Sequence, residues 1–282
     1  MTINADELPA LRDELEAHGL WANKGLGQHF LLDLNITRRI ARTAGDIAGK
    51  PVIEVGPGPG GLTRALLEAG ADPLIVIEKD VRFLPLLEPL NEWSGGRLHI
   101  VQGDALEADE ADLLGRFTPS AQRTAVVSNL PYNVGTPLLV KWLKAGPWRG
   151  EMTLMFQKEV AQRIVAKPGT DAYGRLAVLA QARCEARLEF TVPARAFTPP
   201  PKVASAIVRL TDRQDAYADL AALERVTAAA FGQRRKMLRA ALRSLCPDPE
   251  ALLRQAGLAP TARAEEIGQD GFRALADAWR GT

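Results

Sequence analysis

Three polar residues each follow a short apolar run in this sequence: Glu78, Asp104 and Asn129. If the runs are parallel strands, these side chains meet at one edge of a sheet, where open α/β sheets bind their ligands. A glutamate there can accept hydrogen bonds from both hydroxyls of a ribose, and an aspartate can accept one from the amino group of an adenine. An asparagine can accept an N–H from an exocyclic amine. These residue types predict a pocket for an adenosine-containing ligand, with chemistry at an amine beside it.

A glycine-rich turn narrows the choice of ligand. It reads Gly56-Pro57-Gly58-Pro59-Gly60-Gly61 and joins the apolar run 51–55 to a helical stretch. Such a turn lets a ligand approach the backbone, and three interpretations compete: a dinucleotide site, an S-adenosylmethionine site and a plain tight turn. Glu78 suits either ligand, because NAD and S-adenosylmethionine both contain the adenosine ribose. The acidic Glu54 and the two prolines differ from GxGxxG, and S-adenosylmethionine has no pyrophosphate that needs that loop, so the turn favours S-adenosylmethionine.

The sequence Asn129-Leu130-Pro131-Tyr132 directly follows an apolar strand, at the same sheet edge as the glycine turn. An exocyclic amine on a purine is a poor nucleophile, because its lone pair is delocalised into the ring. The Asn129 side-chain oxygen and the Leu130 carbonyl can accept its two N–H bonds and favour a pyramidal nitrogen. The ring of Tyr132 offers a face on which an unstacked base can lie.

Each of these residues also has a purely structural interpretation. Asp104 could cap a helix N-terminus, Glu78 could be a solvated loop acid, and residues 129–132 could form a β-turn with a buried tyrosine. Their places at successive strand ends favour the ligand site over these alternatives.

The residues that could carry metal or covalent chemistry are scattered. His18, His29 and His99 lie far apart, and no Ser or Cys stands in a nucleophile-elbow sequence. No metal is therefore expected, and direct transfer from a sulfonium needs only positioning. Cys184 and Cys246 are too few for a disulfide framework, and there is no leader-like or membrane-spanning stretch, so we expect a cytoplasmic protein with no membrane partner.

Apolar runs alternate with helical stretches along the first two thirds of the chain. This alternation predicts an α/β fold, a parallel sheet with helices on both faces. Strands are expected at 51–55, 74–77, 98–101, 125–127 and 152–156, with late strands at 185–190 and 205–210 forming an edge pair. Helices are expected at 6–20, from residue 33, and at 62–69, 81–90 and 158–165.

The pattern of residue types along the sequence changes near residue 212. From there to residue 279, Ala, Leu and Arg recur at helical spacing, and no strand is evident. We therefore predict a methyltransferase-type sheet domain over 1–212 and a small helical domain over 213–282. The 282 residues are 46% hydrophobic, which excludes a mostly disordered chain, and the 35 basic and 34 acidic residues, net charge +1, exclude a histone-like protein.

From about Lys24 to Leu210 the chain resembles the ribosomal RNA adenine N6,N6-dimethyltransferase family, and within it the bacterial small-subunit branch. The matching sequences are 26–31 (LGQHFL), the turn 54–63, Glu78, 103–105 (GDA), 129–132 (NLPY), 157–160 (QKEV), 173–176 (YGRL) and 197–203 (FTPPPKV). The resemblance implies a Rossmann-like S-adenosylmethionine-dependent methyltransferase sheet with a helical C-terminal domain, acting as a monomer.

The resemblance also assigns roles to individual residues. It implies that the cofactor S-adenosyl-L-methionine is bound by His29, Leu31, Gly56, Glu78, Asp104 and Asn129. Asn129 would also face the target amine, and Tyr132 and Phe197 would hold the adenine ring between or beside their aromatic faces. Position 29 is His where the family often has Asn, and a neutral imidazole can still donate one hydrogen bond.

A cluster of basic residues marks the C-terminal region. Residues 231–243 contain Arg234, Arg235, Lys236, Arg239 and Arg243 and no acid. On a helix, the arginines spaced four apart would form a stripe that could follow RNA phosphates, although a solvated helix face is the usual explanation. The resemblance implies that this region faces rRNA.

The resemblance implies dimethylation of two adjacent adenines in the hairpin loop near the 3′ end of 16S rRNA, during assembly of the small ribosomal subunit. A stacked adenine cannot reach a pocket at a sheet edge, so the target must lie in a loop or be flipped out. Three alternatives stay open: the large-subunit rRNA methyltransferase that confers macrolide resistance, an RNA-binding assembly factor with little turnover, and a nicotinamide oxidoreductase.

Overall fold

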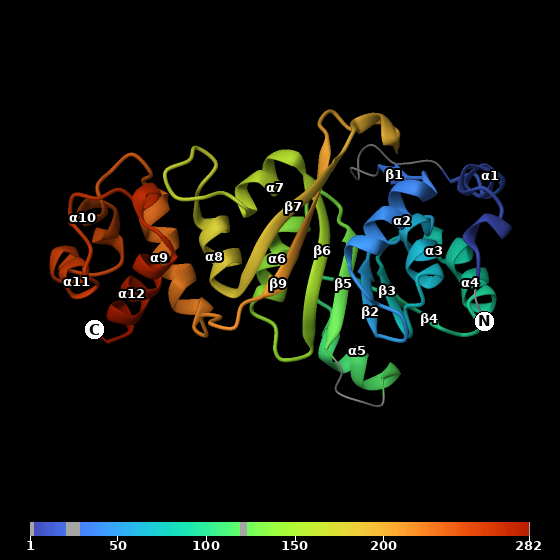
Figure 1. Ribbon diagram of the computed structural model, residues 1–282, viewed down its shortest axis with the longest axis horizontal. Helices are drawn as coiled ribbons and strands as arrows, with labels where there is room; N and C mark the ends of the chain where they lie inside the picture. Colours follow the sequence, from blue (N-terminus) through green and yellow to red (C-terminus); the bar gives the residue numbers. More distant parts are fainter. Residues whose placement is uncertain (1–2, 21–28, 119–122, 282) are drawn as a thin grey trace. The chain divides into compact units, whose positions relative to one another are not determined.

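The computed structural model describes residues 3–20, 29–118 and 123–281 (Figure 1). Its central feature is a seven-stranded sheet with helices packed against it, which confirms the predicted α/β fold. The strands are β2 (Val52–Val55), β3 (Leu74–Glu78), β4 (Leu98–Gln102), β5 (Thr124–Asn129), β6 (Arg149–Gln157), β7 (Cys184–Val192) and β9 (Ser205–Asp212). Residues 24–28, where the glycine-rich sequence KGLGQ predicts a loop, lie outside the described residues.

The strand order in the sheet is β4-β3-β2-β5-β6-β9-β7. The pairs β2–β3, β3–β4, β2–β5 and β5–β6 are all parallel. Successive strands run from β2 towards β4 on one side and from β5 towards β6 on the other, so the order reverses between β2 and β5. The carboxyl ends of strands at such a reversal form a crevice in which α/β sheets bind ligands. The predicted late pair, β9 and β7, forms the edge beyond β6.

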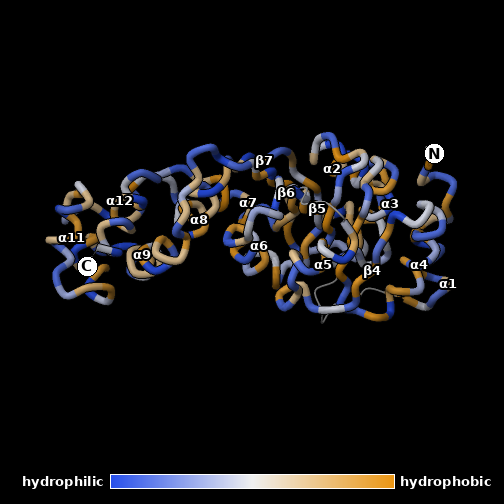
Figure 2. Tube along the Cα trace, turned by 90° about the horizontal axis from the view of Figure 1, so that it is seen from below, coloured by the Kyte–Doolittle hydropathy of each residue, from blue (hydrophilic) through white to orange (hydrophobic). Residues whose placement is uncertain are grey.

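Burial explains why these runs are strands. Every residue of β2 and β3 is buried, as expected where helices cover both faces of a sheet. Figure 2 shows hydrophobic residues prominent where β5 and β6 run. The helices between the strands are α2 (Leu34–Thr43), α3 (Gly61–Glu68), η3 (Val81–Phe83), α4 (Leu84–Trp93), α5 (Glu110–Phe117), α6 (Gly135–Leu143) and α7 (Lys158–Ile164).

The N-terminal segment differs from its prediction. In place of one helix over 6–20, it forms a short turn η1 (Ala5–Glu7) and a helix α1 (Leu11–Ala17). The cause is Pro9, because the residue before a proline is driven out of the α region, and Leu8 is extended. Arg64 of α3 is 3% exposed and donates from Nη1 to the Pro9 carbonyl at 2.6 Å, which fixes this segment on α3.

The chain divides into two compact units. The first comprises 1–161 and 188–209 and contains most of the sheet. The second comprises 162–187 and 210–282, so it includes a segment that the sequence division at residue 212 placed in the first domain. That segment carries helix α8 (Arg175–Arg183), which lies between the last predicted helix, 158–165, and the predicted strand 185–190.

The second unit is helical. Its helices are α8 (Arg175–Arg183), α9 (Leu220–Gly232), α10 (Leu238–Ala241), η5 (Leu242–Ser244), α11 (Pro249–Gln255), η6 (Ala264–Glu266) and α12 (Gln269–Arg280). Phe231 and Phe272 stack with ring centroids 5.4 Å apart, and the hydroxyl of the fully buried Tyr173 donates to the Ile267 carbonyl at 2.8 Å. The motif at 173–176 therefore contributes to the core of this unit. None of the helices in the described residues is long and apolar enough to cross a membrane.

Candidate functional site

A cavity of about 600 Å³ opens at the carboxyl ends of β2, β3, β4 and β5. Residues that lie far apart in the sequence line it. They include every residue predicted for the site: His29, Leu31, Gly56, Glu78, Asp104, Asn129, Tyr132 and Phe197. Volumes of this size are typical of small-molecule sites.

The turn between β2 and α3 depends on its glycines, as two of them show. Gly56 has φ +66°, and a Cβ there would lie 3.3 Å from the ring of Pro131. At Gly61 a Cβ would lie 2.5 Å from the Leu31 carbonyl oxygen. The turn therefore brings the segments 30–31 and 129–132 against the start of α3, leaving backbone rather than side chains at the cavity wall.

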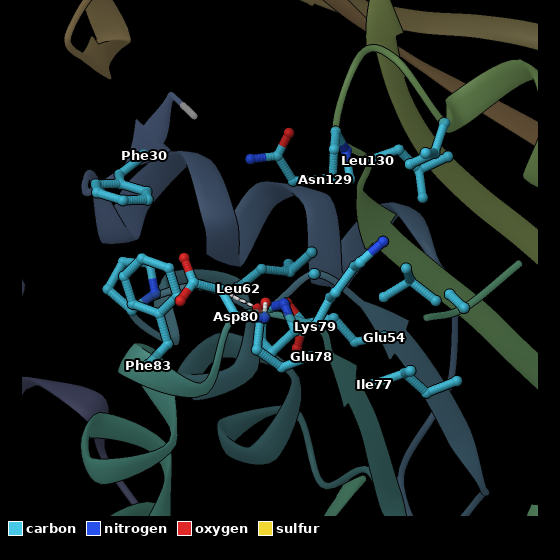
Figure 3. A pocket seen from close by; sticks show the side chains of 18 of the residues that line it. Phe30, Glu54, Leu62, Ile77, Glu78, Lys79, Asp80, Phe83, Asn129 and Leu130 are labelled. Carbon is cyan, nitrogen blue, oxygen red and sulfur yellow. Dashed lines mark hydrogen bonds between the residues drawn. The ribbon is translucent and has the colours of Figure 1, made fainter. Parts of the chain in front are cut away.

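Glu78 ends β3 and lies inside the cavity wall, only 6% exposed. Its two oxygens accept backbone N–H groups, Oε2 from Gly58 at 3.0 Å and Oε1 from Asp80 at 2.8 Å. Burial raises the pKa of Glu78, and these backbone hydrogen bonds oppose the shift. The interpretation of Glu78 as a solvated loop acid is therefore wrong, because its carboxylate ties the glycine turn to β3 and faces the cavity (Figure 3).

Asp104 follows β4 and borders the cavity. Its Oδ1 accepts the Leu106 N–H at 2.9 Å, and its Oδ2 pairs with the Lys79 ammonium at 2.8 Å. Lys79 holds the pKa of Asp104 below its usual range. The helix-cap alternative is wrong in detail, because Asp109 caps the next helix, α5, and Asp104 instead closes the turn that follows β4.

Glu54 lies on β2 beneath the glycine turn and is 1% exposed. Its Oε2 accepts the Thr63 hydroxyl of α3 at 2.7 Å. Burial raises the pKa of Glu54 to about 8, which the Thr63 hydrogen bond partly opposes. The carboxyl at the floor of the cavity therefore holds its proton near neutral pH in the ligand-free protein.

This protonation predicts a pH dependence of stability. The pKa of a glutamate in the unfolded chain is about 4.3, whereas that of Glu54 in the folded chain is about 8. Between these two pH values the folded chain holds a proton that the unfolded chain has released. The free energy of unfolding should therefore fall as pH rises through this window. Glu54→Gln keeps an acceptor for Thr63 and is expected to remove that loss, making the variant more stable than the wild type above pH 8. Urea unfolding of both ligand-free proteins from pH 5 to 9 checks this, and parallel profiles would contradict it.

The segment after β5 is held by a bond to β2. The hydroxyl of the buried Ser128 donates to the Val55 carbonyl at 2.6 Å, and Asn129 follows at the end of the strand. Figure 3 shows the Asn129 amide projecting into the cavity. Within the described part of the chain this amide has no hydrogen-bonding partner, so its oxygen and nitrogen are available to a ligand.

Tyr132 and the N-terminal segment form the wall next to Asn129. The Tyr132 hydroxyl hydrogen-bonds the Ser205 hydroxyl at 2.8 Å, which fixes the half-buried ring. His29 lies beside it, with ring centroids 5.8 Å apart, and its Nδ1 lies 2.8 Å from the Pro199 carbonyl oxygen. That carbonyl can only accept, so Nδ1 carries a proton and donates to it.

Phe197 enters the same wall through a two-stranded sheet. Strand β1 (Phe30–Leu31) pairs antiparallel with β8 (Phe197–Thr198), and Leu31 lies opposite Phe197. Phe197 is 3% exposed, so it meets the cavity with little of its surface. The pairing of two short strands that are far apart in the sequence thus brings His29, Leu31 and Phe197 together. No local sequence pattern predicts this pairing.

The sequence analysis missed a hydrophobic layer behind the cavity. Leu15 of α1 packs in one cluster with Phe30, Phe83 and Leu86. Phe30 and Phe83 meet edge to face at 5.4 Å and both line the cavity, as Figure 3 shows. Leu11 and Leu15, four residues apart and both buried, give the only sequence signal, an apolar side of a short helix.

The predicted arginine stripe is wrong. Helix α9 ends at Gly232, and Met237 is extended and bridges Arg263 before α10 begins at Leu238. Gly232 is the last residue of α9, and glycine disfavours a continuing helix because it loses more backbone entropy in a helix than any other residue. The basic residues thus fall on a loop and a separate helix. Within the described residues, Arg234 pairs with Glu265 and Arg239 with Glu250, whereas the exposed Arg235, Lys236 and Arg243 make no ion pair.

No group of three or more His, Cys, Asp or Glu side chains is placed to hold a metal ion within the ranges that the structure describes. The cavity offers carboxylates, the side-chain amides of Asn129 and Asn133, glycine backbone and aromatic rings. This set suits a neutral or cationic organic ligand with hydroxyl and amino groups.

Comparison with known proteins gives a consistent result across nearly the whole chain. The family model "Ribosomal RNA adenine dimethylase" matches residues 19–277. The ribosomal RNA small subunit methyltransferase A of Phenylobacterium zucineum is 62% identical over 281 residues, covering 98% of this chain and 95% of the relative. The protein of the same name from Maricaulis maris is 55% identical over 285 residues, covering 99% and 97%.

Two solved structures have a similar fold. A dimethyladenosine transferase from Plasmodium falciparum has a TM-score of 0.71 at 24% identity, covering 88% of this chain and 96% of that one. The 23S rRNA methyltransferase ErmE has a TM-score of 0.65 at 28% identity, covering 89% and 99%. The sheet and its crevice are therefore a methyltransferase architecture.

Proposed function

This chain belongs to the ribosomal RNA adenine dimethylase family, and from that premise we propose that it dimethylates N6 of two adjacent adenosines near the 3′ end of 16S rRNA. The methyl donor is S-adenosyl-L-methionine, and the step belongs to assembly of the small ribosomal subunit. One observation carries this proposal: Glu78, Asp104 and Asn129, from three separate strand ends, border the same cavity as the glycine turn. A pure RNA-binding protein would need none of these groups.

The cavity fits S-adenosylmethionine. The glycine turn presents backbone at the cavity wall, as close approach of a ligand requires, and the cavity volume suits a ligand of this size. Glu78 is placed to accept the ribose hydroxyls and Asp104 the adenine amino group, while His29, Leu31 and Gly56 border the remaining part. When bound, the cofactor supplies an electrophilic methyl group on a sulfonium.

Asn129 and Leu130 act on the target amine. The side-chain oxygen of Asn129 accepts one N–H, and the Leu130 carbonyl accepts the other, which localises the nitrogen lone pair for attack. The Ser128 bond to β2 holds this segment in place, so the two acceptors need no rearrangement when the amine arrives. Direct transfer from a sulfonium needs only this positioning.

The ring of Tyr132 stacks on the flipped-out base, and the nearly buried Phe197 borders the same wall of the cavity. The hydrogen bond to Ser205 fixes the Tyr132 ring, so little conformational freedom is lost when an adenine stacks on it. Base–aromatic stacking contributes about 1–3 kcal/mol per base, which offsets part of the free energy of unstacking.

Arg235, Lys236 and Arg243 form the RNA contact of the helical unit. Replacing Arg235 and Lys236 together with alanine is expected to weaken binding to small-subunit particles. Fewer phosphate contacts then form, so fewer counterions are released on binding, and the magnitude of the slope of log K against log salt should fall by about 1–2. Fluorescence titrations at several salt concentrations measure this slope. The matched control is the pair Arg12→Ala and Lys50→Ala, two exposed cations of the first unit. An equal slope in both double variants would remove the basic loop from the interface.

The proposal is tested in a bacterial strain whose small-subunit rRNA lacks N6,N6-dimethyladenosine. We propose that the enzyme is cytoplasmic and monomeric. Its expression should restore the nucleoside in 16S rRNA and leave 23S rRNA unchanged. Its appearance in 23S rRNA would favour the macrolide-resistance activity, and its absence from both, with the protein expressed, would contradict the proposal.

A further inference from the structure

We propose that Lys141 is a positioning residue for the adenine side of the cavity, acting through the turn that carries Asp104. Lys141 lies on α6 and is not among the residues that line the cavity. The inference rests on the proposed role of Asp104 in holding the adenine amino group. It adds a residue that neither the sequence motifs nor the site geometry had assigned.

The Lys141 ammonium makes three hydrogen bonds. Nζ donates to the Ala105 carbonyl at 2.7 Å, to the Ala108 carbonyl at 2.5 Å and to Glu110 Oε1 at 2.9 Å. An ammonium has three N–H donors, so all of them are used. Two of the acceptors belong to the turn that begins at Asp104, so a single side chain fixes both ends of that turn.

Glu110 fixes the ammonium in turn. Its carboxylate is 5% exposed and also accepts the indole N–H of the fully buried Trp142 at 2.8 Å. Lys141 and Trp142 are neighbours on α6, so Glu110 has two anchors on one helix. Charged hydrogen bonds in a low-dielectric setting hold their geometry more tightly than exposed ones. The side chain of Lys79, the other cation near Asp104, is 76% exposed and cannot supply this rigidity.

The position of α6 in the chain gives the contact a functional meaning. Helix α6 begins at Gly135, three residues after Tyr132, and so continues directly from the segment that carries Asn129. Lys141 therefore links the wall that faces the target amine to the wall that faces the donor adenine. The distance between the two walls sets where the donor lies relative to the amine.

The test compares S-adenosylhomocysteine with its analogue that carries hydrogen in place of the 6-amino group. Calorimetric titration of the wild type should show tighter binding of the amino form by about tenfold, one charge-assisted hydrogen bond. In Lys141→Met, which keeps the length of the side chain without its charge, that ratio should fall towards one, while the dissociation constant of the desamino analogue changes less than twofold. General loosening of the fold would instead weaken both ligands equally.

Two further variants complete the design. Lys144→Met, an exposed position at the C-cap of the same helix, should keep the wild-type ratio. Lys141→Arg keeps the charge and should give an intermediate ratio, and it replaces Lys141→Met if that variant does not fold. A wild-type ratio in Lys141→Met or Lys141→Arg would overturn the role of Lys141. If the wild type itself did not distinguish the ligands although it bound both, the adenine contact of Asp104 would fail, and the methyltransferase assignment would stand.

Discussion

Replacing Asn129 with alanine lowers the rate of methyl transfer by about 10³-fold or more, the scale expected when a group that stabilises only the transition state is removed. The cavity keeps its shape in this variant, because Ser128 and not Asn129 ties the strand end to β2. The dissociation constant of S-adenosylhomocysteine should therefore rise but remain measurable. A single-turnover assay and a calorimetric titration of the same preparation separate the two effects.

The matched control is Asn91→Ala on α4, an exposed asparagine away from the cavity. It should leave both the rate and the affinity at wild-type values. Full activity in Asn129→Ala would remove this residue from the mechanism. Loss of cofactor binding along with activity would show that its main role is in the cofactor site and not at the target amine.

Replacing Glu78 with alanine weakens cofactor binding by about 1–3 kcal/mol, the range for hydrogen bonds to a charged group. Two losses add up in this variant. The ribose hydroxyls lose their acceptor, and the backbone N–H groups of Gly58 and Asp80 lose the carboxylate that now holds them. Glu78→Gln keeps one acceptor oxygen and should give a smaller loss.

Titration of S-adenosylhomocysteine into both Glu78 variants measures this effect, with Glu88→Ala, an exposed glutamate of α4, as the control. An unchanged dissociation constant in Glu78→Ala would show that Glu78 only supports the glycine turn. Unfolding curves recorded in parallel show whether the backbone contacts matter for stability without ligand.

The sequence was most informative where functional residues lie at the ends of strands. The apolar runs before Glu78, Asp104 and Asn129 predicted three strand ends, and parallel pairing then required those side chains to share one edge. The glycine turn was equally readable, because Gly56 adopts a positive φ and a Cβ at Gly61 would collide with the Leu31 carbonyl oxygen. Local pattern and tertiary geometry impose the same residues at these positions.

Other features depend on contacts that no local pattern announces. The pairing of Leu31 with Phe197, the three bonds of Lys141 and the hydrogen bond between Tyr132 and Ser205 each join distant segments. The arginine stripe failed for the opposite reason, because helical spacing was projected through Gly232, where the helix ends. The grouping of 162–187 with the helical unit likewise arises from packing and not from composition.

The competing functions make different demands on the same cavity. A nicotinamide oxidoreductase would need a loop for a pyrophosphate, whereas this turn carries Pro57 and Pro59 and lies above the buried carboxyl of Glu54. Tight binding of NAD with no affinity for S-adenosylhomocysteine would support that alternative. The similarity to ErmE, a 23S rRNA methyltransferase, does not identify the ribosomal subunit. The small-subunit methyltransferases that are 55–62% identical to this chain favour the small subunit.

The central claim is that this cavity transfers methyl groups to adenosines of the small subunit. Its most direct test is to incubate the purified protein with labelled S-adenosylmethionine and small ribosomal subunits that lack these methyl groups, with large subunits as the control, and then to analyse the nucleosides. We predict labelled N6,N6-dimethyladenosine from the small subunit alone, and none with Asn129→Ala. Label in the large subunit, or none in either while the protein still binds small subunits, would contradict the account.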